Sequence, residues 1–548
     1  MNLSNADLAI AQAREFDIVV IGSGGAGLMS ALAAARAGAR VLLVEKSSLL
    51  GGTTAISGGQ IWLPGNPHME DLGRNDDRYA TLAYLRQVTL GSVPEQYLEA
   101  FADAAPGVVT FIESATDLRL FAVDRPDYHA EWPGACDGRS LEPLPFTHVN
   151  PAGYPSVRRS RYRRPVTSVE SRQNSAADLA DQREKNGQLT QGAALVAALV
   201  EACAKAGVEI IANARFHDFS FSDGRISGVR ISDMDGGVER AIQAHAVILA
   251  CGGFEWNTTL TKAFFGTVPQ LPVSPPFNEG DGLLAGLCVG AQLANMGESW
   301  WTAAIQIPGE AEDGQAAARN VVRELALPGS IMVNRAGHRF ANEASSYNDL
   351  GKAFLRFDPK SCTYPNDKAW LVFDSNFKRR YNVLTVSKNQ PPPDWFIQAD
   401  SPALLAKRIG VSPVDLQHTV AAFNDQARHG VDQQFGRGDS RHDQFYGDIE
   451  HKPNACLAPL DVAPFYAVPI SLGNLGTKGG LATSLEGAVL DREGNAIAGL
   501  FACGNVAASW MGLGYPGAGG SLGPILTAAL LCGREIVRSI GFQDLNAV

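Results

Sequence analysis

The first residues whose types and spacing can do chemistry are three glycines near the start of the chain. Gly22, Gly24 and Gly27 form the pattern Gly-x-Gly-x-x-Gly. In such a pattern the first glycine permits a tight turn, the second lets the backbone approach a pyrophosphate, and the third lets a helix pack closely on a strand. Glu45 follows about 20 residues later, where an acidic side chain can accept hydrogen bonds from ribose hydroxyls. The spacing predicts a dinucleotide-binding site.

Two strands and a helix must position this loop. The apolar, β-branched run 17–21 is typical of a buried parallel strand. Residues 28–37 are rich in Ala and Leu and predict a helix, and 41–44 predict a second strand. The N-terminus of that helix would present free N–H groups to the phosphates. We therefore expect a Rossmann-type unit at the start of the chain.

A second glycine-rich loop, 51–59, follows the second predicted strand and favours FAD over NAD. It lies where a bound dinucleotide would continue toward its flavin, and its small residues leave room for an isoalloxazine ring. Cofactor contacts are predicted along both N-terminal loops and their flanks: Gly22, Ser23, Gly24, Gly25, Ala26, Gly27, Glu45, Lys46, Gly52, Thr53, Thr54, Ser57, Gly58 and Gly59.

Further glycine clusters flank the middle of the chain. An alternating stretch, 216–246, has turn signals at Asp223-Gly224 and Asp235-Gly236-Gly237 and predicts a β-meander. It leads into an apolar strand, 246–250, which precedes a glycine pair. The cofactor contacts predicted at this end are Ala250, Gly252 and Gly253.

The C-terminal segment repeats this arrangement. The strand expected at 499–503 ends in glycine, and the glycine-rich turn 515–524 opens a helix over 525–536. Gly504, Asn505, Gly520, Ser521 and Leu522 are predicted to contact the cofactor. The two ends of the chain must then fold together around one cofactor and enclose what the middle forms.

Composition narrows the function classes. The 548 residues include 57 acidic and 46 basic side chains, a net charge of −11 that argues against a nucleic-acid-binding surface. The eight cysteines contain no Cys-x-x-Cys pair, which is typical of a reducing compartment, and no metal site is predicted. No signal peptide or membrane-spanning stretch is recognisable, so a cytoplasmic protein is expected.

These motifs resemble those of the fumarate reductase/succinate dehydrogenase flavoprotein superfamily. The fingerprint, the loop 51–59 and the segment Gly499-Leu-x-x-Cys-Gly-Asn505 carry that resemblance. Other stretches are similar to the bacterial 3-ketosteroid Δ1-dehydrogenases, namely 126–129, 342–347, 475–480 and 515–519. The resemblance covers most of the chain and fails between about residues 145 and 189.

The resemblance implies roles for four residues in steroid degradation. The Tyr515 hydroxyl and the Gly519 N–H would bind the C3 carbonyl oxygen of a 3-ketosteroid and stabilise enolate character. Tyr347 would take a proton from C2, with Tyr128 hydrogen-bonded beside it, and a hydride would pass from C1 to flavin N5. Because the reference pKa of tyrosine is about 10, Tyr347 needs a lowered pKa or a shared proton.

The resemblance also implies the architecture and the cofactor. We expect an α/β protein with a Rossmann-type FAD-binding domain, built from a parallel sheet plus a β-meander, and an inserted α+β substrate-capping domain. The predicted boundaries are 1–279 and 456–548 for the two parts of the FAD-binding domain and 280–455 for the cap. Residues 47–59 contain no histidine, so the FAD is expected to be non-covalent.

Several alternatives remain open. A Δ4-(5α)-dehydrogenase would share the fold with a different tyrosine arrangement. A fumarate-reductase-like enoate reductase would need a cationic shell, and no such shell is recognisable, so an uncharged, apolar substrate is expected. A non-catalytic flavin-binding subunit would need no base. Lys478 is expected to be a structural or flavin-side contact.

Five arginines gather in the segment where the resemblance fails. Arg158, Arg159, Arg161, Arg163 and Arg164 most simply form a solvated surface insertion. The hypothesis attached to them is contact with a membrane surface, an acidic partner or another subunit. The other partners implied are the 3-ketosteroid and an external, quinone-type electron acceptor.

Overall fold

The cofactor-binding half is built on a sheet whose central strands are parallel. The computed structural model describes residues 15–173, 175–234, 237 and 239–541. The strand order is β21 (Ala488–Leu490), β22 (Ala496–Ala502), β11 (Arg240–Leu249), β1 (Phe16–Ile21), β2 (Val41–Val44) and β8 (Glu209–Ile211). From β22 to β8 every pairing is parallel. Strands from both ends of the chain therefore share one sheet, as predicted.

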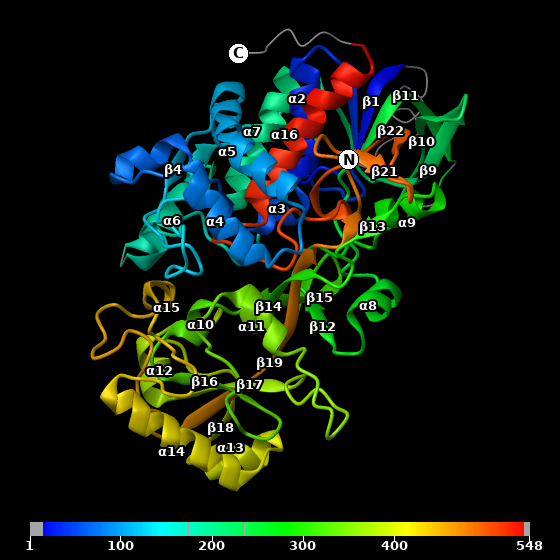
Figure 1. The fold of residues 1–548 in the computed structure, drawn as a ribbon. Coiled ribbons are helices and arrows are strands. Elements are labelled where there is room, and N and C mark those ends of the chain that lie inside the picture. The colour runs from blue at the N-terminus through cyan, green and yellow to red at the C-terminus, as the bar shows by residue number, and fades with distance from the viewer. Residues whose placement is uncertain (1–14, 174, 235–236, 238, 542–548) are drawn as a thin grey trace.

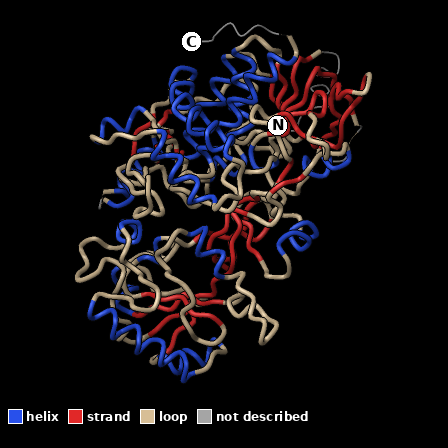
Figure 2. The backbone as a smooth tube through the Cα atoms, viewed as in Figure 1, coloured by secondary structure: helices blue, strands red, loops and turns tan. Residues whose placement is uncertain are grey.

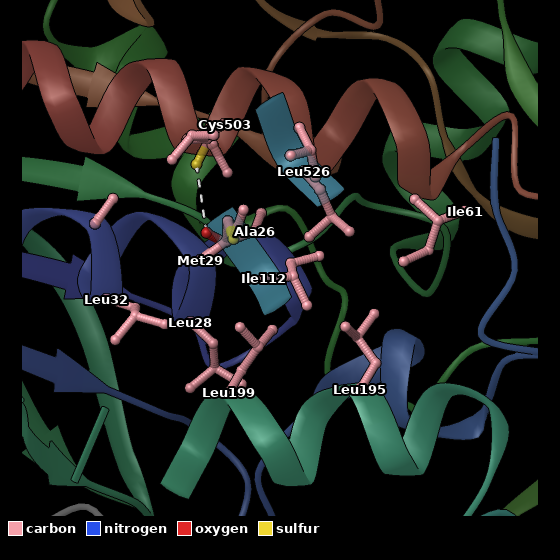
Figure 3. Close-up of a cluster of buried hydrophobic side chains, with 14 of the residues drawn as sticks. Ala26, Leu28, Met29, Leu32, Ile61, Ile112, Leu195, Leu199, Cys503 and Leu526 are labelled. Atoms are coloured by element: carbon pink, nitrogen blue, oxygen red, sulfur yellow. Dashed lines mark hydrogen bonds between the residues drawn. The ribbon is translucent and has the colours of Figure 1, made fainter. Parts of the chain in front are cut away.

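Helices from distant parts of the sequence cover this sheet and form its core. These are α2 (Gly25–Arg36), α7 (Gln191–Lys205), α16 (Leu522–Ser539) and α5 (Glu95–Ala115), grouped in the upper lobe of Figure 1. Figure 3 shows Leu28 and Leu32 of α2 between Leu199 of α7 and Leu526 of α16. The fingerprint helix is thus held from both sides by apolar side chains.

The fingerprint helix begins earlier than predicted. It starts at Gly25 and not at Leu28, because the last residues of the glycine loop already form its first turn. The N-terminal N–H groups therefore lie directly after Gly24. The predicted meander is present as β9 (Ala214–Ser222), β10 (Arg225–Asp233) and β11, with a turn at Asp223-Gly224. Asp235 and Gly236 of the second turn signal lie outside the described residues.

A second sheet supports the middle of the chain in the lower lobe of Figure 1. Its order is β15 (Gln315–Asn320), β14 (Ser299–Glu312), β19 (Phe465–Thr477), β17 (Ala369–Asp374) and β16 (Ser330–Asn334). Two short strands, β12 (Gln270–Pro272) and β18 (Ile397–Ala399), also pair with β19. Figure 2 shows these strands between loops and helices. The α/β fold with a capping unit is confirmed, while the boundaries at 279/280 and 455/456 stay predictions.

Shorter elements connect and cover the two sheets. Those of the upper lobe and its edge are α3 (Gly52–Ile56), η1 (Pro67–Leu72), α4 (Arg78–Thr89), η2 (Glu170–Arg172), α6 (Ala176–Lys185), α8 (Thr258–Phe265), α9 (Asp281–Cys288) and η3 (Gly504–Val506). The middle contributes α10 (Arg323–Ala326), α11 (Tyr347–Ala353), α12 (Ser375–Arg380), α13 (Pro402–Ile409), α14 (Pro413–His429) and α15 (Arg441–Tyr446). Small sheets pair β3 (Ile61–Trp62) and β4 (Leu120–Ala122) with β5 (Ser140–Pro143), β6 (Phe146–Thr147) with β7 (Gln188–Leu189), and β13 (Leu293–Ala294) with β20 (Gly480–Leu481).

Candidate active site

Two adjoining cavities lie where the N-terminal loops meet the capping unit. The smaller, of about 110 Å³, follows the fingerprint. The larger, of about 560 Å³, begins at the loop 53–60 and extends to the capping unit. Thr53, Thr54, Asn505 and Ile525 line both cavities, so the two are continuous. Together they form one elongated site.

The three fingerprint glycines do different things in this site. Gly22 has a φ of +106°, and a Cβ there would lie 2.5 Å from the Ala250 carbonyl oxygen. A Cβ on Gly27 would lie 1.9 Å from the Gly22 carbonyl oxygen. Gly24 has an ordinary extended backbone and lines the smaller cavity, and a Cβ there would meet nothing within 4 Å. The first two glycines permit close packing, while Gly24 leaves open the space that a pyrophosphate needs.

Glu45 is held rigidly beside this space. Its carboxylate accepts hydrogen bonds from the Ser23 N–H at 2.9 Å and the Ser23 hydroxyl at 2.6 Å. The other carboxylate oxygen accepts from the Ser47 N–H at 2.7 Å. These bonds leave lone pairs on a buried carboxylate that lines the cavity. The geometry fits the predicted contact with ribose hydroxyls.

Most of the predicted cofactor residues line the two cavities. They are Gly22, Ser23, Gly24, Gly25, Ala26, Glu45, Lys46, Gly52, Thr53, Thr54, Ser57, Gly58, Gly59, Ala250, Gly252, Gly504, Asn505, Ser521 and Leu522. Gly27, Gly253 and Gly520 do not line them. A Cβ on Gly253 would lie 2.2 Å from the Thr477 hydroxyl, so this glycine serves close packing.

Lys46 lines the cavity wall but its ammonium group is engaged elsewhere. Its Nζ atom lies 2.6 Å from carboxylate oxygens of both Glu279 and Asp281. Arg158, which was not predicted to contact the cofactor, lines the same cavity and donates to the Ser47 hydroxyl at 2.9 Å. A dinucleotide at this site would therefore meet one more guanidinium group than the sequence indicated.

Three tyrosines from remote parts of the chain meet in the larger cavity. The Tyr347 hydroxyl donates a hydrogen bond to the Tyr515 hydroxyl. The Tyr128 ring lies 5.6 Å from the Tyr347 ring and 5.5 Å from the Tyr515 ring, measured between centroids. All three line the cavity, together with Gly519. The structure thus brings together the four residues predicted to be catalytic.

The loop that carries Tyr515 is fastened from several directions. Tyr84 donates to the Pro516 carbonyl oxygen at 2.6 Å, and the Tyr128 N–H donates to the same oxygen at 3.0 Å. Gly519 has a φ of +93°, and its carbonyl accepts from the Trp62 N–H at 3.1 Å. No described residue accepts a hydrogen bond from the Gly519 N–H. This N–H is therefore free to donate to a ligand, which its predicted role requires.

Lys478 supports the loop that carries Tyr515. Its buried ammonium group donates to the Gly514 carbonyl oxygen at 2.7 Å and lies 4.6 Å from the Trp300 ring centroid. Burial lowers the pKa of Lys478 to about 7. Lys352 donates to the neighbouring Leu513 carbonyl oxygen at 2.6 Å. Both lysines therefore position the residues next to Tyr515, in agreement with the structural role expected for Lys478.

The phenols are protonated at neutral pH in this arrangement. Burial raises the pKa of Tyr347 well above its ordinary value, and the neighbouring Tyr515 raises it further. Burial also raises the pKa of Tyr128 and of Tyr515. The structure therefore gives Tyr347 a raised and not a lowered pKa, because burial disfavours the charged form and no described cation is bonded to the phenol. The hydroxyl-to-hydroxyl bond is the route by which a proton can be shared.

A fourth tyrosine and a histidine complete the cluster and were missed from the sequence. The Tyr446 hydroxyl lies 3.5 Å from the Tyr128 hydroxyl. Tyr128 was expected to form its hydrogen bond with Tyr347 instead. The His442 ring centroid lies 4.6 Å from that of Tyr128. Burial lowers the pKa of His442 to about 3, so its ring is neutral. Both residues are on α15, and no spacing in the sequence marks them.

Arginine side chains also line the larger cavity, which corrects the expectation of a site without a cationic shell. Five arginines reach it from the β4–β5 connection, the 158–164 segment, η2, β15 and α10, namely Arg125, Arg163, Arg172, Arg319 and Arg323. Arg319 is neutralised by Glu310, 2.8 Å away. The sequence could not reveal this grouping, because it depends on how distant loops meet.

The arginine-rich segment is not a uniform surface patch. Arg158 is buried and forms ion pairs with Glu312 and Asp313 at 3.1 and 2.6 Å, so the expectation of surface exposure is wrong for it. Arg164 is exposed and pairs with Asp181 and Glu184. Arg159, Arg161 and Arg163 are also exposed. Arg161 donates to the Ala311 carbonyl oxygen, and Arg163 lines the larger cavity.

Comparisons with known proteins agree with this geometry. A family model described as an FAD binding domain matches residues 17–522. The chain is 39% identical to 4-oxocyclohexanecarboxylate 2-dehydrogenase of Sinomonas cyclohexanicum, over 96% of this chain and 94% of that protein. It is 34% identical to 3-oxosteroid 1-dehydrogenase of Mycobacterium tuberculosis, over 96% of this chain and 99% of that protein.

A solved structure is similar over the whole length. The crystal structure of 3-ketosteroid Δ1-dehydrogenase from Sterolibacterium denitrificans in complex with 1,4-androstadiene-3,17-dione superimposes with a TM-score of 0.89. It is 32% identical and covers 96% of this chain and 100% of that chain. Among the described residues, no helix is long and apolar enough to cross a membrane.

Proposed function

This chain belongs to the FAD binding domain family of flavoproteins, and on that premise we propose that it is a 3-ketosteroid Δ1-dehydrogenase. It removes one hydrogen from each of two adjacent ring carbons, C1 and C2, next to a ring carbonyl group. The observation that carries the proposal is the meeting of Tyr128, Tyr347, Tyr515 and the free Gly519 N–H in one cavity beside the FAD site.

In this proposal Tyr515 and Gly519 act on the carbonyl oxygen, and Tyr347 acts on the C2 proton. The Tyr515 hydroxyl and the Gly519 N–H are donors that can bind the C3 oxygen as it gains negative charge. This makes the C2 proton more acidic, and Tyr347 accepts it. Bound FAD supplies the hydride acceptor for the hydrogen at C1. The Tyr515 side chain is buried, which strengthens its interaction with the carbonyl oxygen.

The proton that Tyr347 accepts must be matched by one that it gives up. Tyr347 donates a hydrogen bond to Tyr515 in the structure. As C2 loses its proton to Tyr347, the proton of Tyr347 can pass to Tyr515 and that of Tyr515 to the C3 oxygen, which gives the enol. Tyr128 and Tyr446 lie beside this pair. Tyr347 therefore acts through a shared proton and not through a depressed pKa. The reduced enzyme then needs an external acceptor, for which we propose a quinone-type molecule met in the cytoplasm or at a membrane surface.

A second candidate is supported by a specific observation. The relative with 39% identity is named for a single-ring ketone that carries a carboxylate, not for a steroid. Oxidation of such a ring next to its carbonyl group needs the same two donors and the same base. The four site residues therefore fit either ring system, and the rest of the cavity must distinguish them.

The experiment that tests the proposed function identifies the product. The purified protein should be yellow, and acid precipitation should release all of its FAD, because no histidine lies near the flavin loop to bind it covalently. With an artificial electron acceptor, androst-4-ene-3,17-dione should lose two hydrogens and give the 1,4-diene, as mass spectrometry and NMR would show.

Three other outcomes would contradict the proposal in different ways. Formation of a 4-ene from a 5α-saturated ketone alone would indicate a Δ4-(5α)-dehydrogenase. Fumarate-dependent oxidation of a reduced dye would indicate an enoate reductase. Turnover of 4-oxocyclohexanecarboxylate without turnover of the steroid would select the second candidate.

A further inference from the structure

Four arginines line the larger cavity without a carboxylate partner. Arg125, Arg163, Arg172 and Arg323 come from the β4–β5 connection, the 158–164 segment, η2 and α10. Among the described residues, no carboxylate oxygen lies within the 4.0 Å of an ion pair with any of them. A cavity that gathers several cations without neutralising them has an electrostatic preference for an anion.

Arg125 shows the preference most clearly. Its side chain is buried, with 4% of the residue exposed, and only one of its guanidinium nitrogens donates to another residue, the Ser168 hydroxyl at 3.2 Å. The Nε and Nη1 atoms have no hydrogen-bond partner. An unpaired buried charge is costly unless a ligand supplies the missing acceptor. The aromatic ring of Phe445, 5.0 Å away, offers only a weak substitute.

Arg172 and Arg323 add positive charge beside Arg125. The Arg172 guanidinium lies 4.0 Å from the Phe445 ring centroid and donates to the Phe445 carbonyl oxygen at 3.0 Å. Partial burial, together with repulsion from Arg125 and Arg323, lowers the pKa of Arg172 to about 10. The three guanidinium groups therefore lie close enough to destabilise one another in the absence of an anion.

Arg163 places a positive charge near the flavin loop 51–59. Its guanidinium lies near Gly58 of the flavin loop, where an added Cβ would be 3.9 Å from Nη1. Arg163 is solvent-exposed at the rim of the cavity, and the negative charge of Glu142 acts on it from nearby. The side chain projects into the cavity and has no hydrogen-bond partner among the described residues. It is free to reach a ligand.

The nearest carboxylates do not neutralise the group. Both oxygens of Glu142 accept from uncharged donors, the Gln60 amide at 2.5 Å and the Ser168 N–H at 2.8 Å. Glu324 accepts from the Leu384 N–H at 3.0 Å, and burial raises its pKa. The four guanidinium groups thus outweigh the acidic side chains beside them.

The phosphates of FAD do not explain these arginines. The fingerprint loop lines the smaller cavity, and the guanidinium group there is that of Arg158. Arg125, Arg163, Arg172 and Arg323 line only the larger cavity, which also holds the four tyrosines. An anion bound by the buried Arg125 and by these three neighbours at the rim would therefore belong to what lies beside the tyrosines.

We propose that the substrate is a ring ketone that carries a carboxylate, and that Arg125, Arg163, Arg172 and Arg323 form the subsite that binds this carboxylate. The inference rests on the part of the proposed function that both candidates share, the dehydrogenation of a ring ketone whose carbonyl end faces Tyr347 and Tyr515. Two sources supply the same chemistry: a single ring with its carboxylate attached directly, or a steroid with an acidic side chain. Guanidinium groups suit either, because they bind carboxylates through paired hydrogen bonds.

Binding of a molecule that cannot react tests the subsite independently of the reaction. The holoenzyme should bind cyclohexanecarboxylate about tenfold or more tightly than cyclohexanecarboxamide, as followed by the flavin absorbance. Arg163→Gln should remove this difference, whereas Arg159→Gln, from the same segment but outside the cavity, should preserve it. Neither probe has a ketone, so failure of the proposed reaction would leave this result unaffected.

Turnover then distinguishes the two sources. The acid and the amide of 4-oxocyclohexanecarboxylic acid should be compared with the acid and the amide of a 3-ketosteroid bearing a carboxylate side chain. The pair that shows the lower KM for the acid identifies the source, and Arg163→Gln or Arg323→Gln should raise that KM about tenfold with little change in kcat. Equal binding of the acid and amide probes in the wild-type protein, or an equal effect of Arg163→Gln on both, would overturn the proposal.

Discussion

Replacing Tyr347 with phenylalanine is expected to lower kcat by about 10²–10⁴-fold, the range that a positioned general acid or base contributes. The phenyl ring keeps the packing against Tyr128 and Tyr515, so only the group that accepts the proton is lost. The measurement is steady-state turnover of the ring ketone with an artificial acceptor, together with the flavin absorbance spectrum. FAD should remain bound in full, because the hydroxyl contacts another tyrosine and not the cofactor loops.

A matched substitution controls for the loss of a buried hydroxyl. Tyr97 also donates one hydrogen bond, to the Thr483 carbonyl oxygen at 2.7 Å, but does not line the cavity. Tyr97→Phe should lower kcat less than about twofold, because exposed or half-buried hydrogen bonds contribute only about 1 kcal/mol to stability and none here to the reaction. A Tyr347→Phe enzyme with the activity of Tyr97→Phe would remove Tyr347 from the mechanism.

Gly24→Val is expected to abolish FAD binding while the protein still folds. The backbone at Gly24 is extended, a conformation open to any residue, and an added Cβ would meet no protein atom within 4 Å. The valine side chain would instead occupy the space kept for the pyrophosphate. We expect purified Gly24→Val to be colourless, with a circular dichroism spectrum like that of the wild-type protein.

The control is a glycine with similar freedom outside the site. Gly107 on α5 is exposed, and a Cβ there would also meet nothing within 4 Å. Gly107→Val should therefore bind FAD normally. Normal FAD content in Gly24→Val would show that the fingerprint does not hold the pyrophosphate, and an unfolded protein would show that the open space is structural.

The parts of the fold that follow from local patterns could be predicted from the sequence. The run 17–21 is a strand because its β-branched residues are buried on both faces, and Gly22 must be glycine because of its positive φ. The helix after it starts three residues earlier than expected, because periodicity begins only where the apolar residues begin. Helix ends depend on the loop geometry, which the pattern does not contain.

The site was predictable only where motifs mark it. Tyr128, Tyr347 and Tyr515 were identified through a family resemblance, and no spacing within the chain connects them. Tyr446 and His442 carry no such mark, since they reach Tyr128 through the packing of α15.

The burial and the grouping of the arginines could not be predicted for the same physical reason. A run of charges is usually solvated, and the partners of Arg158 are about 150 residues away in sequence, on and beside β14. Likewise, Arg125, Arg172 and Arg323 come together only when three separate segments meet at Phe445 and the cavity wall. Interactions between distant segments must be seen in the fold, and they decide the charge of this site.

The most direct test of the central claim, that buried phenols take a proton from the carbon beside the ring carbonyl, is a single-turnover comparison of substrates. One ketone carries deuterium on that carbon, and the other carries hydrogen there. The account predicts that the deuterated ketone is converted more slowly by the wild-type enzyme. When both hydrogens on that carbon are replaced by deuterium, the account also predicts that one deuterium passes to the solvent and one stays in the product. Conversion at equal rates with both deuterium atoms retained on that carbon would contradict it.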